Sequence, residues 1–159
     1  MSFKNRIFQL LIILGITFLF GDKLYSQSKT INLNTLQQTQ KEDLKPIFYF
    51  IHTDWCGYCK SMLKTTFKNK NVDNLLQSKV HFVKINAEEK SPIIFNNTTY
   101  YYQPQGYKVG RHSILEALGI PMGTSNFPII LIKNEKNETL FSYSGFLNSQ
   151  EIIQILDLL

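Results

Sequence analysis

The sequence predicts a single α/β domain in which helices flank a central β-sheet. Residues 47–51 and 80–86 are runs rich in apolar, aromatic and β-branched residues, a pattern typical of strands buried on both faces. Apolar residues recur at helical spacing after the first run, and again in a closing helix over 149–159. The length that follows a predicted N-terminal targeting segment suits one domain with a proper core.

The C-terminal third predicts a hairpin followed by that closing helix. Residues 129–132 and 139–143 flank a polar turn, as antiparallel strands do. Asn148 or Ser149 is a suitable N-cap, with Glu151 in the first turn. We expect five apolar residues on the inner face of the helix: Ile152, Ile153, Ile155, Leu156 and Leu159.

The polar segment before the first buried run predicts two short elements. A strand is expected at 30–33, and a helix from about Thr35 that turns Leu36 and Leu44 inward. Pro46 ends this helix because proline disfavours continued helical conformation.

The only two cysteines of the chain, Cys56 and Cys59, stand two residues apart after the first buried run. Met62, Leu63 and Phe67 follow at helical spacing, so Cys56 is expected at or near the first turn of a helix. Backbone N–H groups and the helix dipole favour an anion there, and cysteines in such places have pKa values of roughly 3.5–7.5. Cys59 lies close enough to close a disulfide with Cys56. The pattern indicates a redox-active dithiol.

Two other interpretations of the cysteine pair carry less weight. A structural zinc site needs four ligands, and the spacing of His52, His81 and His112 matches no common zinc pattern. A purely structural disulfide would close so short a loop that it would constrain the unfolded chain little. We therefore expect no metal site.

Two motifs resemble the thioredoxin superfamily. Residues 46–60 resemble its active-site strand and helix start, and the Trp-Cys-Gly-aromatic-Cys-Lys motif resembles that of secreted thioredoxin-like proteins. Met62, and then Phe67 with Val72, match residues that often follow this motif. Residues 126–132 resemble the cis-proline loop of the family and the strand after it.

The resemblance implies a thioredoxin-like fold with a central mixed sheet and thiol–disulfide oxidoreductase activity. The Cys56 thiolate would attack a substrate disulfide and Cys59 would resolve the mixed disulfide. The Cys56–Cys59 disulfide would be the sole redox group, with no further cofactor. The implied partners are proteins carrying disulfides or thiols, together with a redox partner that recycles the dithiol.

The resemblance also implies substrate-binding residues. Phe127 and Pro128 would lie beside Cys56 with a cis bond between them, and would pair with an extended substrate strand. Trp55 is either a substrate contact or a core aromatic residue. Gly57 and Tyr58 resemble the dipeptide of periplasmic disulfide isomerases, but the chain has no room for their dimerisation domain, so we expect a monomer.

One departure from the family pattern concerns proton transfer. Thioredoxins carry a buried carboxylate six residues before the first cysteine, where this chain has Phe50. Lys84 matches the lysine that those proteins place on the neighbouring strand. His52 lies on the same strand face as Phe50 and is either a substitute proton carrier or an ordinary half-buried histidine.

The segment 87–110 is longer than a thioredoxin core requires. Residues 92–95 and 98–102 predict a β-hairpin around an Asn96-Asn97 turn, and residues 111–118 predict a helix that ends at Gly119. The hairpin either covers the sheet edge or supplies a substrate platform formed by Tyr100, Tyr102, Tyr107 and Arg111.

The redox pair and the hairpin region leave two functions open. The first is an oxidoreductase. The most oxidising members of the family it resembles place a histidine between their cysteines, where this chain has Gly57-Tyr58, so the resemblance favours reduction or repair over oxidation. The alternative is a redox-inert thioredoxin-fold module that binds a partner through residues 91–111. The intact cysteine pair favours the first.

Residues 1–26 have the organisation of a secretory signal peptide. Lys4 and Arg6 precede an apolar stretch over 7–20, which is shorter than the roughly 20 residues of a membrane-spanning helix. We expect cleavage and a periplasmic or secreted domain over 27–159. An uncleaved segment that contacts the membrane is the alternative.

The charge balance does not indicate a nucleic-acid partner. The formal charge is +5, and removing residues 1–26 takes away three basic residues and one acidic residue, leaving +3. The remaining lysines are scattered and form no basic stripe with interleaved aromatic residues.

Overall fold

The computed structural model describes residues 30–107 and 109–159. The predicted signal peptide, residues 1–26, lies outside the described residues.

A four-stranded sheet of order β2-β1-β7-β8 forms the centre of the structure. Strand β1 (Ile47–His52) runs parallel to β2 (His81–Asn86) and antiparallel to β7 (Ile129–Lys133). Strand β8 (Thr139–Ser144) pairs antiparallel with β7 at the edge. The mixed sheet and the α/β fold class predicted from the sequence are confirmed.

The central strand β1 is buried because both of its faces meet helices. Phe48 and Phe50 pack edge-on against Phe67, with ring centroids 6.3 Å and 4.9 Å apart, on the face covered by the helices that follow β1. Tyr49 points to the other face and lines a cavity together with Leu36. Successive side chains of β1 thus pack on opposite faces of the sheet, against a helical layer on each face.

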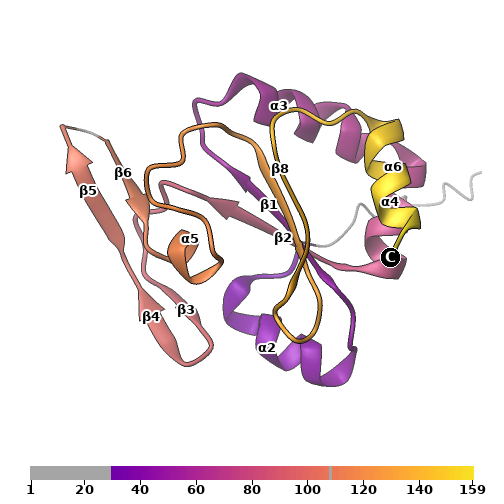
Figure 1. Ribbon diagram of the computed structural model, residues 1–159, viewed down its shortest axis with the longest axis horizontal. Helices are drawn as coiled ribbons and strands as arrows, with labels where there is room; N and C mark the ends of the chain where they lie inside the picture. Colours follow the sequence, from indigo (N-terminus) through magenta and orange to yellow (C-terminus); the bar gives the residue numbers. More distant parts are fainter. Residues whose placement is uncertain (1–29, 108) are drawn as a thin grey trace, which may run out of the picture.

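Helices α3 (Gly57–Lys64) and α4 (Lys70–Lys79) are joined by a 3-10 turn and lie on the same side as α6 (Ser149–Asp157) (Figure 1). Asn148 caps α6 with its side chain, and Glu151 completes the capping box by accepting from the Asn148 N–H. The predicted N-cap is therefore confirmed.

Three predictions near the chain ends are wrong. Residues 30–33 form no strand, because helix α2 (Leu33–Glu42) already begins at Leu33, although the Ile31 N–H donates to the Phe82 carbonyl at the sheet edge. Leu44 is 74% exposed because it follows the end of α2, while Leu36 is buried as predicted. Leu159 is also exposed, since α6 ends at Asp157.

The hairpin around Asn96-Asn97 is confirmed. Strands β3 (Ile93–Phe95) and β4 (Thr98–Tyr100) pair antiparallel. Both asparagines have positive φ, 49° and 59°, as a two-residue type I′ turn requires. The Ile94 N–H donates to Asn34 Oδ1, which ties the hairpin to α2.

A second hairpin follows that the sequence pattern did not predict. Strands β5 (Tyr102–Gly106) and β6 (Val109–His112) pair antiparallel, and both hairpins lie together on one side of the molecule (Figure 1). The helix predicted for 111–118 is shortened to α5 (Ile114–Ala117), because Arg111 and His112 belong to β6. Gly110 is required here, since a Cβ would collide with the Tyr102 side chain and the Gln103 carbonyl.

Over the described ranges, no helix combines the length and apolar character needed to cross a membrane.

Candidate active site

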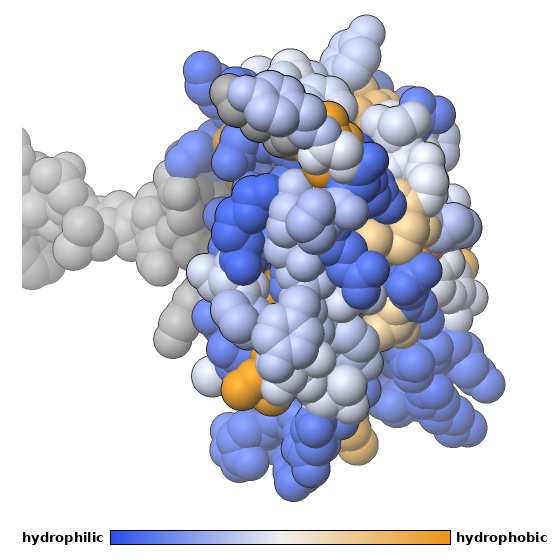
Figure 2. All heavy atoms as spheres, turned by 90° about the vertical axis from the view of Figure 1, so that its left-hand side faces the viewer, coloured by the Kyte–Doolittle hydropathy of each residue, from blue (hydrophilic) through white to orange (hydrophobic). Residues whose placement is uncertain are grey.

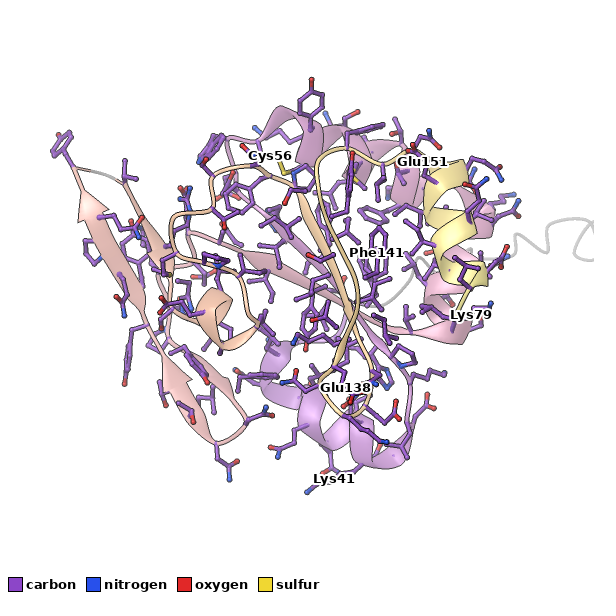
Figure 3. All side chains as sticks on the ribbon, in the orientation of Figure 1. Lys41, Cys56, Lys79, Glu138, Phe141 and Glu151 are labelled. Carbon is purple, nitrogen blue, oxygen red and sulfur yellow. A yellow bond between two sulfur atoms is a disulfide. The ribbon has the colours of Figure 1, made fainter. Side chains whose placement is uncertain are left out.

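The two cysteines form a disulfide at the start of α3. The Cys56 and Cys59 sulfurs are bonded, and both residues are buried, with 4% and 1% exposure. Figure 3 labels Cys56 at the end of the sheet where β1 leads into α3. Strand β1 ends at His52, and the short turn Thr53–Trp55 leads directly to Cys56. The end of the buried strand therefore fixes the position of the pair.

Cys56 is the N-cap of α3. Its Sγ accepts a hydrogen bond from the Cys59 N–H at 3.0 Å, and its carbonyl accepts the first helical bond from the Lys60 N–H. A sulfur in this place faces N–H groups that the helix leaves unpaired. The same arrangement would stabilise a Cys56 thiolate after reduction.

The cis-proline loop lies next to this turn. The Phe127–Pro128 bond is cis, as the resemblance implies, and both residues are buried. The Phe127 ring meets the Trp55 ring edge-on at 6.2 Å. The Gly145 N–H donates to the Pro128 carbonyl at 2.8 Å, which holds the loop against β8.

Exposed aromatic rings flank the disulfide on two sides. Trp55 is 60% exposed and Tyr58 is 67% exposed, so the interpretation of Trp55 as a core residue does not hold. The Tyr58 ring contacts Phe146 at 6.3 Å. Gly57 between them is exposed, and a Cβ there would meet no atom within 4 Å.

Two charged residues at the site were not assigned this role from the sequence. Glu88 Oε2 accepts a hydrogen bond from Trp55 Nε1 at 3.1 Å, and Glu88 Oε1 pairs with Arg111 Nη1 at 2.6 Å. The Arg111 guanidinium lies 5.1 Å from the centre of the Phe127 ring. No spacing in the sequence links these residues, because they come together only through the β5–β6 hairpin.

The predicted substrate platform is wrong in its membership. Arg111 is 7% exposed and points inward, whereas Tyr107 is 87% exposed on the hairpin. Tyr102 lies under the Lys90 ammonium, which is 3.1 Å from its ring centre. Arg111 is therefore not part of an exposed platform with Tyr107.

The predicted proton carriers lie close to Phe50. The His52 ring stacks on Phe50 at 5.7 Å, which places both on one face, and Lys84 is the register partner of Phe50 on β2. Burial lowers the pKa of His52, and the charge of Lys84 lowers it further, while Asp54 and the Thr53 backbone act in the opposite direction. Among the described residues, no hydrogen bond joins His52 or Lys84 to either cysteine.

The described part of the chain also contains no group of three or more His, Cys, Asp or Glu side chains that could hold a metal ion.

Comparison with known proteins assigns the family. The family model described as "Thioredoxin-like domain" matches residues 33–159. The chain belongs to this family. No curated protein matches the sequence significantly.

Solved structures share the fold at low sequence identity. A structure described as DsbH oxidoreductase has a TM-score of 0.58 at 16% identity, with 89% of this chain and 96% of that chain covered. A thioredoxin-fold protein from Helicobacter pylori has a TM-score of 0.55 at 13% identity, with coverages of 85% and 75%. The C-terminal domain of Neisseria meningitidis DsbD in the reduced form has a TM-score of 0.53 at 17% identity, with coverages of 78% and 90%.

Proposed function

We propose that this protein is a thiol–disulfide oxidoreductase that exchanges disulfides with exported proteins. The observation that carries the proposal is the Cys56–Cys59 disulfide at the N-terminus of α3, beside the cis-proline loop of a thioredoxin-like domain. This arrangement supplies a stabilised thiolate, a resolving thiol and an adjacent surface for substrate.

The sulfur exchange itself takes place between the two cysteines and the substrate sulfurs. In the reduced protein, the Cys56 thiolate attacks one sulfur of a substrate disulfide; the substrate S–S bond breaks, and the leaving thiolate takes up a proton. Cys59 then loses its proton and attacks Cys56 Sγ, which releases the second substrate thiolate. Two electrons pass from the dithiol to the substrate, and the reverse sequence oxidises a substrate dithiol.

The roles of the two cysteines follow from their positions. Cys56 is the N-cap and accepts the N–H of Cys59, so its thiolate receives the stabilisation of the helix start. Cys59 lies one turn inside the helix at 1% exposure, which suits a resolving thiol that reacts only within the mixed disulfide.

The substrate is expected to lie across the disulfide between the exposed aromatic rings. Trp55 and Tyr58 offer apolar surface, Gly57 leaves open space between them, and Phe127-Pro128 lies alongside. An extended polypeptide fits this surface because its backbone can pair with the loop while its side chains contact the rings.

Proton transfer from Cys59 needs another acceptor than in thioredoxins, because Phe50 occupies the place of the usual carboxylate. Burial lowers the pKa of His52, which favours the neutral ring that can accept a proton. We propose that His52, with Lys84 beside it, takes this part through solvent.

The Trp-Cys-Gly-Tyr-Cys-Lys motif supports a reducing or repairing role. The predicted signal peptide supports a location in the periplasm or outside the cell. Strong oxidants of the superfamily gain their potential from a stabilised thiolate, and neither Gly57 nor Tyr58 adds a positive charge. A cleaved signal peptide, a monomeric state and a separate partner that re-reduces the dithiol complete the proposal.

Reduction of insulin by dithiothreitol tests the activity. The mature protein should accelerate precipitation of the insulin B chain, and Cys56→Ser should not. Titration against glutathione tests the direction, because we expect a midpoint between about −270 and −180 mV, whereas a midpoint near −120 mV would identify an oxidant.

The alternative of a redox-inert binding module draws on the exposed hairpins. Ile94, Tyr101 and Val109 are each half or more exposed, but Figure 2 shows a face of mostly hydrophilic and intermediate residues with separate apolar spots. Inactivity of the wild-type protein in the insulin assay would favour this alternative.

A further inference from the structure

Four side chains from four separate segments form a closed ring of contacts beside the disulfide. Trp55 precedes α3, Glu88 follows β2, Arg111 belongs to β6 and Phe127 precedes the cis-proline. Each contacts the next, and Phe127 contacts Trp55 again. The second hairpin is thereby connected to the Trp55–Phe127 side of the proposed substrate site.

Glu88 joins two of these segments through its two carboxylate oxygens. Oε2 accepts from Trp55 Nε1 at 3.1 Å and Oε1 accepts from Arg111 Nη1 at 2.6 Å. A carboxylate held from both sides fixes the indole in one orientation, because a charged hydrogen bond is stronger than a neutral one. Trp55 is otherwise 60% exposed and would be free to change rotamer.

Burying the Arg111 guanidinium costs desolvation free energy, and packing alone does not explain why this residue is an arginine. It is 7% exposed, and its Nη1 also donates to the Gly110 carbonyl at 3.0 Å. Its Nε is buried without a hydrogen-bond partner among the described residues. An apolar residue would avoid this desolvation, so the guanidinium is more easily explained by a role at the site than by stability.

We propose that Arg111 is a positioning residue for substrate docking, a role that rests on the proposed oxidoreductase function. Arg111 contacts neither sulfur. It holds Trp55 through Glu88 and supports the face of Phe127, so that these two contacting rings form one fixed wall beside the disulfide. The inserted hairpin thus sets how an extended substrate docks.

The kinetic test compares Arg111→Met with Lys133→Met. Lys133 is the matched control because it is also buried, at 6% exposure, and donates to the Asn137 carbonyl at the far end of β7. Arg111→Met should raise the KM for insulin roughly tenfold while kcat changes less than about twofold, since the interaction serves binding rather than chemistry. Lys133→Met should leave both constants at the wild-type values.

Trp55 provides a second readout because it is the only tryptophan of the chain. Arg111→Met should lower the fluorescence anisotropy of Trp55, and Lys133→Met should not. The glutathione equilibrium constant of the Cys56–Cys59 pair should stay within about twofold of the wild-type value, because Arg111 does not contact the sulfurs.

A double-mutant cycle separates positioning from general destabilisation. If Arg111 acts through Trp55, the KM increase of Arg111→Met combined with Trp55→Phe should be smaller than the product of the single increases. Increases that multiply would overturn the proposal, as would an unchanged KM or an unchanged anisotropy in Arg111→Met. Should Arg111→Met fail to fold by circular dichroism, Arg111→Lys and Glu88→Gln carry the same expectations, because a lysine cannot reproduce the planar contact with Phe127 and a neutral amide weakens the pair.

The proposed function and this inference fail in different ways. A wild-type protein that does not reduce insulin would contradict the function, whereas an active wild type whose Arg111 variants match it in KM and anisotropy would contradict the inference alone.

Discussion

The sheet and the inserted hairpins differ in what holds them in place. In β1, five consecutive residues are buried between two helical layers, and their side chains contact both. In β5, four of five residues are exposed, although three of the four residues of its partner β6 are buried. The hairpins are attached to the body through β6, Phe95 and the Ile94–Asn34 hydrogen bond. The sheet therefore holds the cysteines within a packed core, while the second hairpin adds the buried Arg111 side chain to the site.

The largest stability effect is expected in the sheet. Phe50→Ala should lower the free energy of unfolding by about 3–5 kcal/mol, because it removes a fully buried ring packed against Phe67 and His52. Urea unfolding followed by circular dichroism measures this change. A loss below about 1 kcal/mol would mean that the sheet is not the stability-determining region.

A moderate, pH-dependent effect is expected where the hairpins join the body. His112 is fully buried, and burial lowers its pKa below the usual value, although Glu89 and the Ser91 carbonyl oppose this. The unfolded chain therefore binds a proton at higher pH than the folded one, so stability is complete above about pH 6.5 and falls as the pH drops below it. His52 contributes with the same sign.

The comparison of wild type with His112→Gln isolates this contribution. The free energy of unfolding of the wild-type protein, measured with urea, should fall when the pH is lowered from 7.5 to 5.5. The free energy of unfolding of His112→Gln should fall less over the same interval. Identical pH dependence in the two proteins would show that His112 is not held neutral by the fold.

The smallest effect is expected at the tip of the second hairpin. Tyr107 is 87% exposed, so Tyr107→Ser should change the free energy of unfolding by less than about 0.5 kcal/mol. The same urea titration measures it, next to Phe50→Ala. A loss comparable with that of Phe50→Ala would remove the distinction between the two regions.

The sheet and the redox pair could be predicted because their determinants are local. Buried runs define β1 and β2, and the cysteine spacing indicates the redox pair. The cis-proline loop around Pro128 was predicted through the resemblance to the thioredoxin superfamily. The turn at Asn96-Asn97 could likewise be predicted from its own two residues, because type I′ geometry favours asparagine.

The second hairpin could not be predicted, because its strands depend on pairing rather than on composition. Strand β5 contains Pro104 and ends at Gly106, residues that disfavour strands, and residues 111–118 have the spacing of a helix. Arg111 and His112 are nevertheless in a strand, because they pair with β5 and the His112 N–H donates to the Ala87 carbonyl. The Glu88–Arg111 pair was missed for the same reason.

The central claim is that Cys56 at the helix start is the attacking sulfur and Cys59 the resolving one. Cys59→Ser should trap mixed disulfides on Cys56 when incubated with a disulfide substrate, and Cys56→Ser should trap almost none. Mass spectrometry of non-reduced samples counts these adducts directly. Equal trapping by both variants, or trapping on Cys59 alone, would contradict the account.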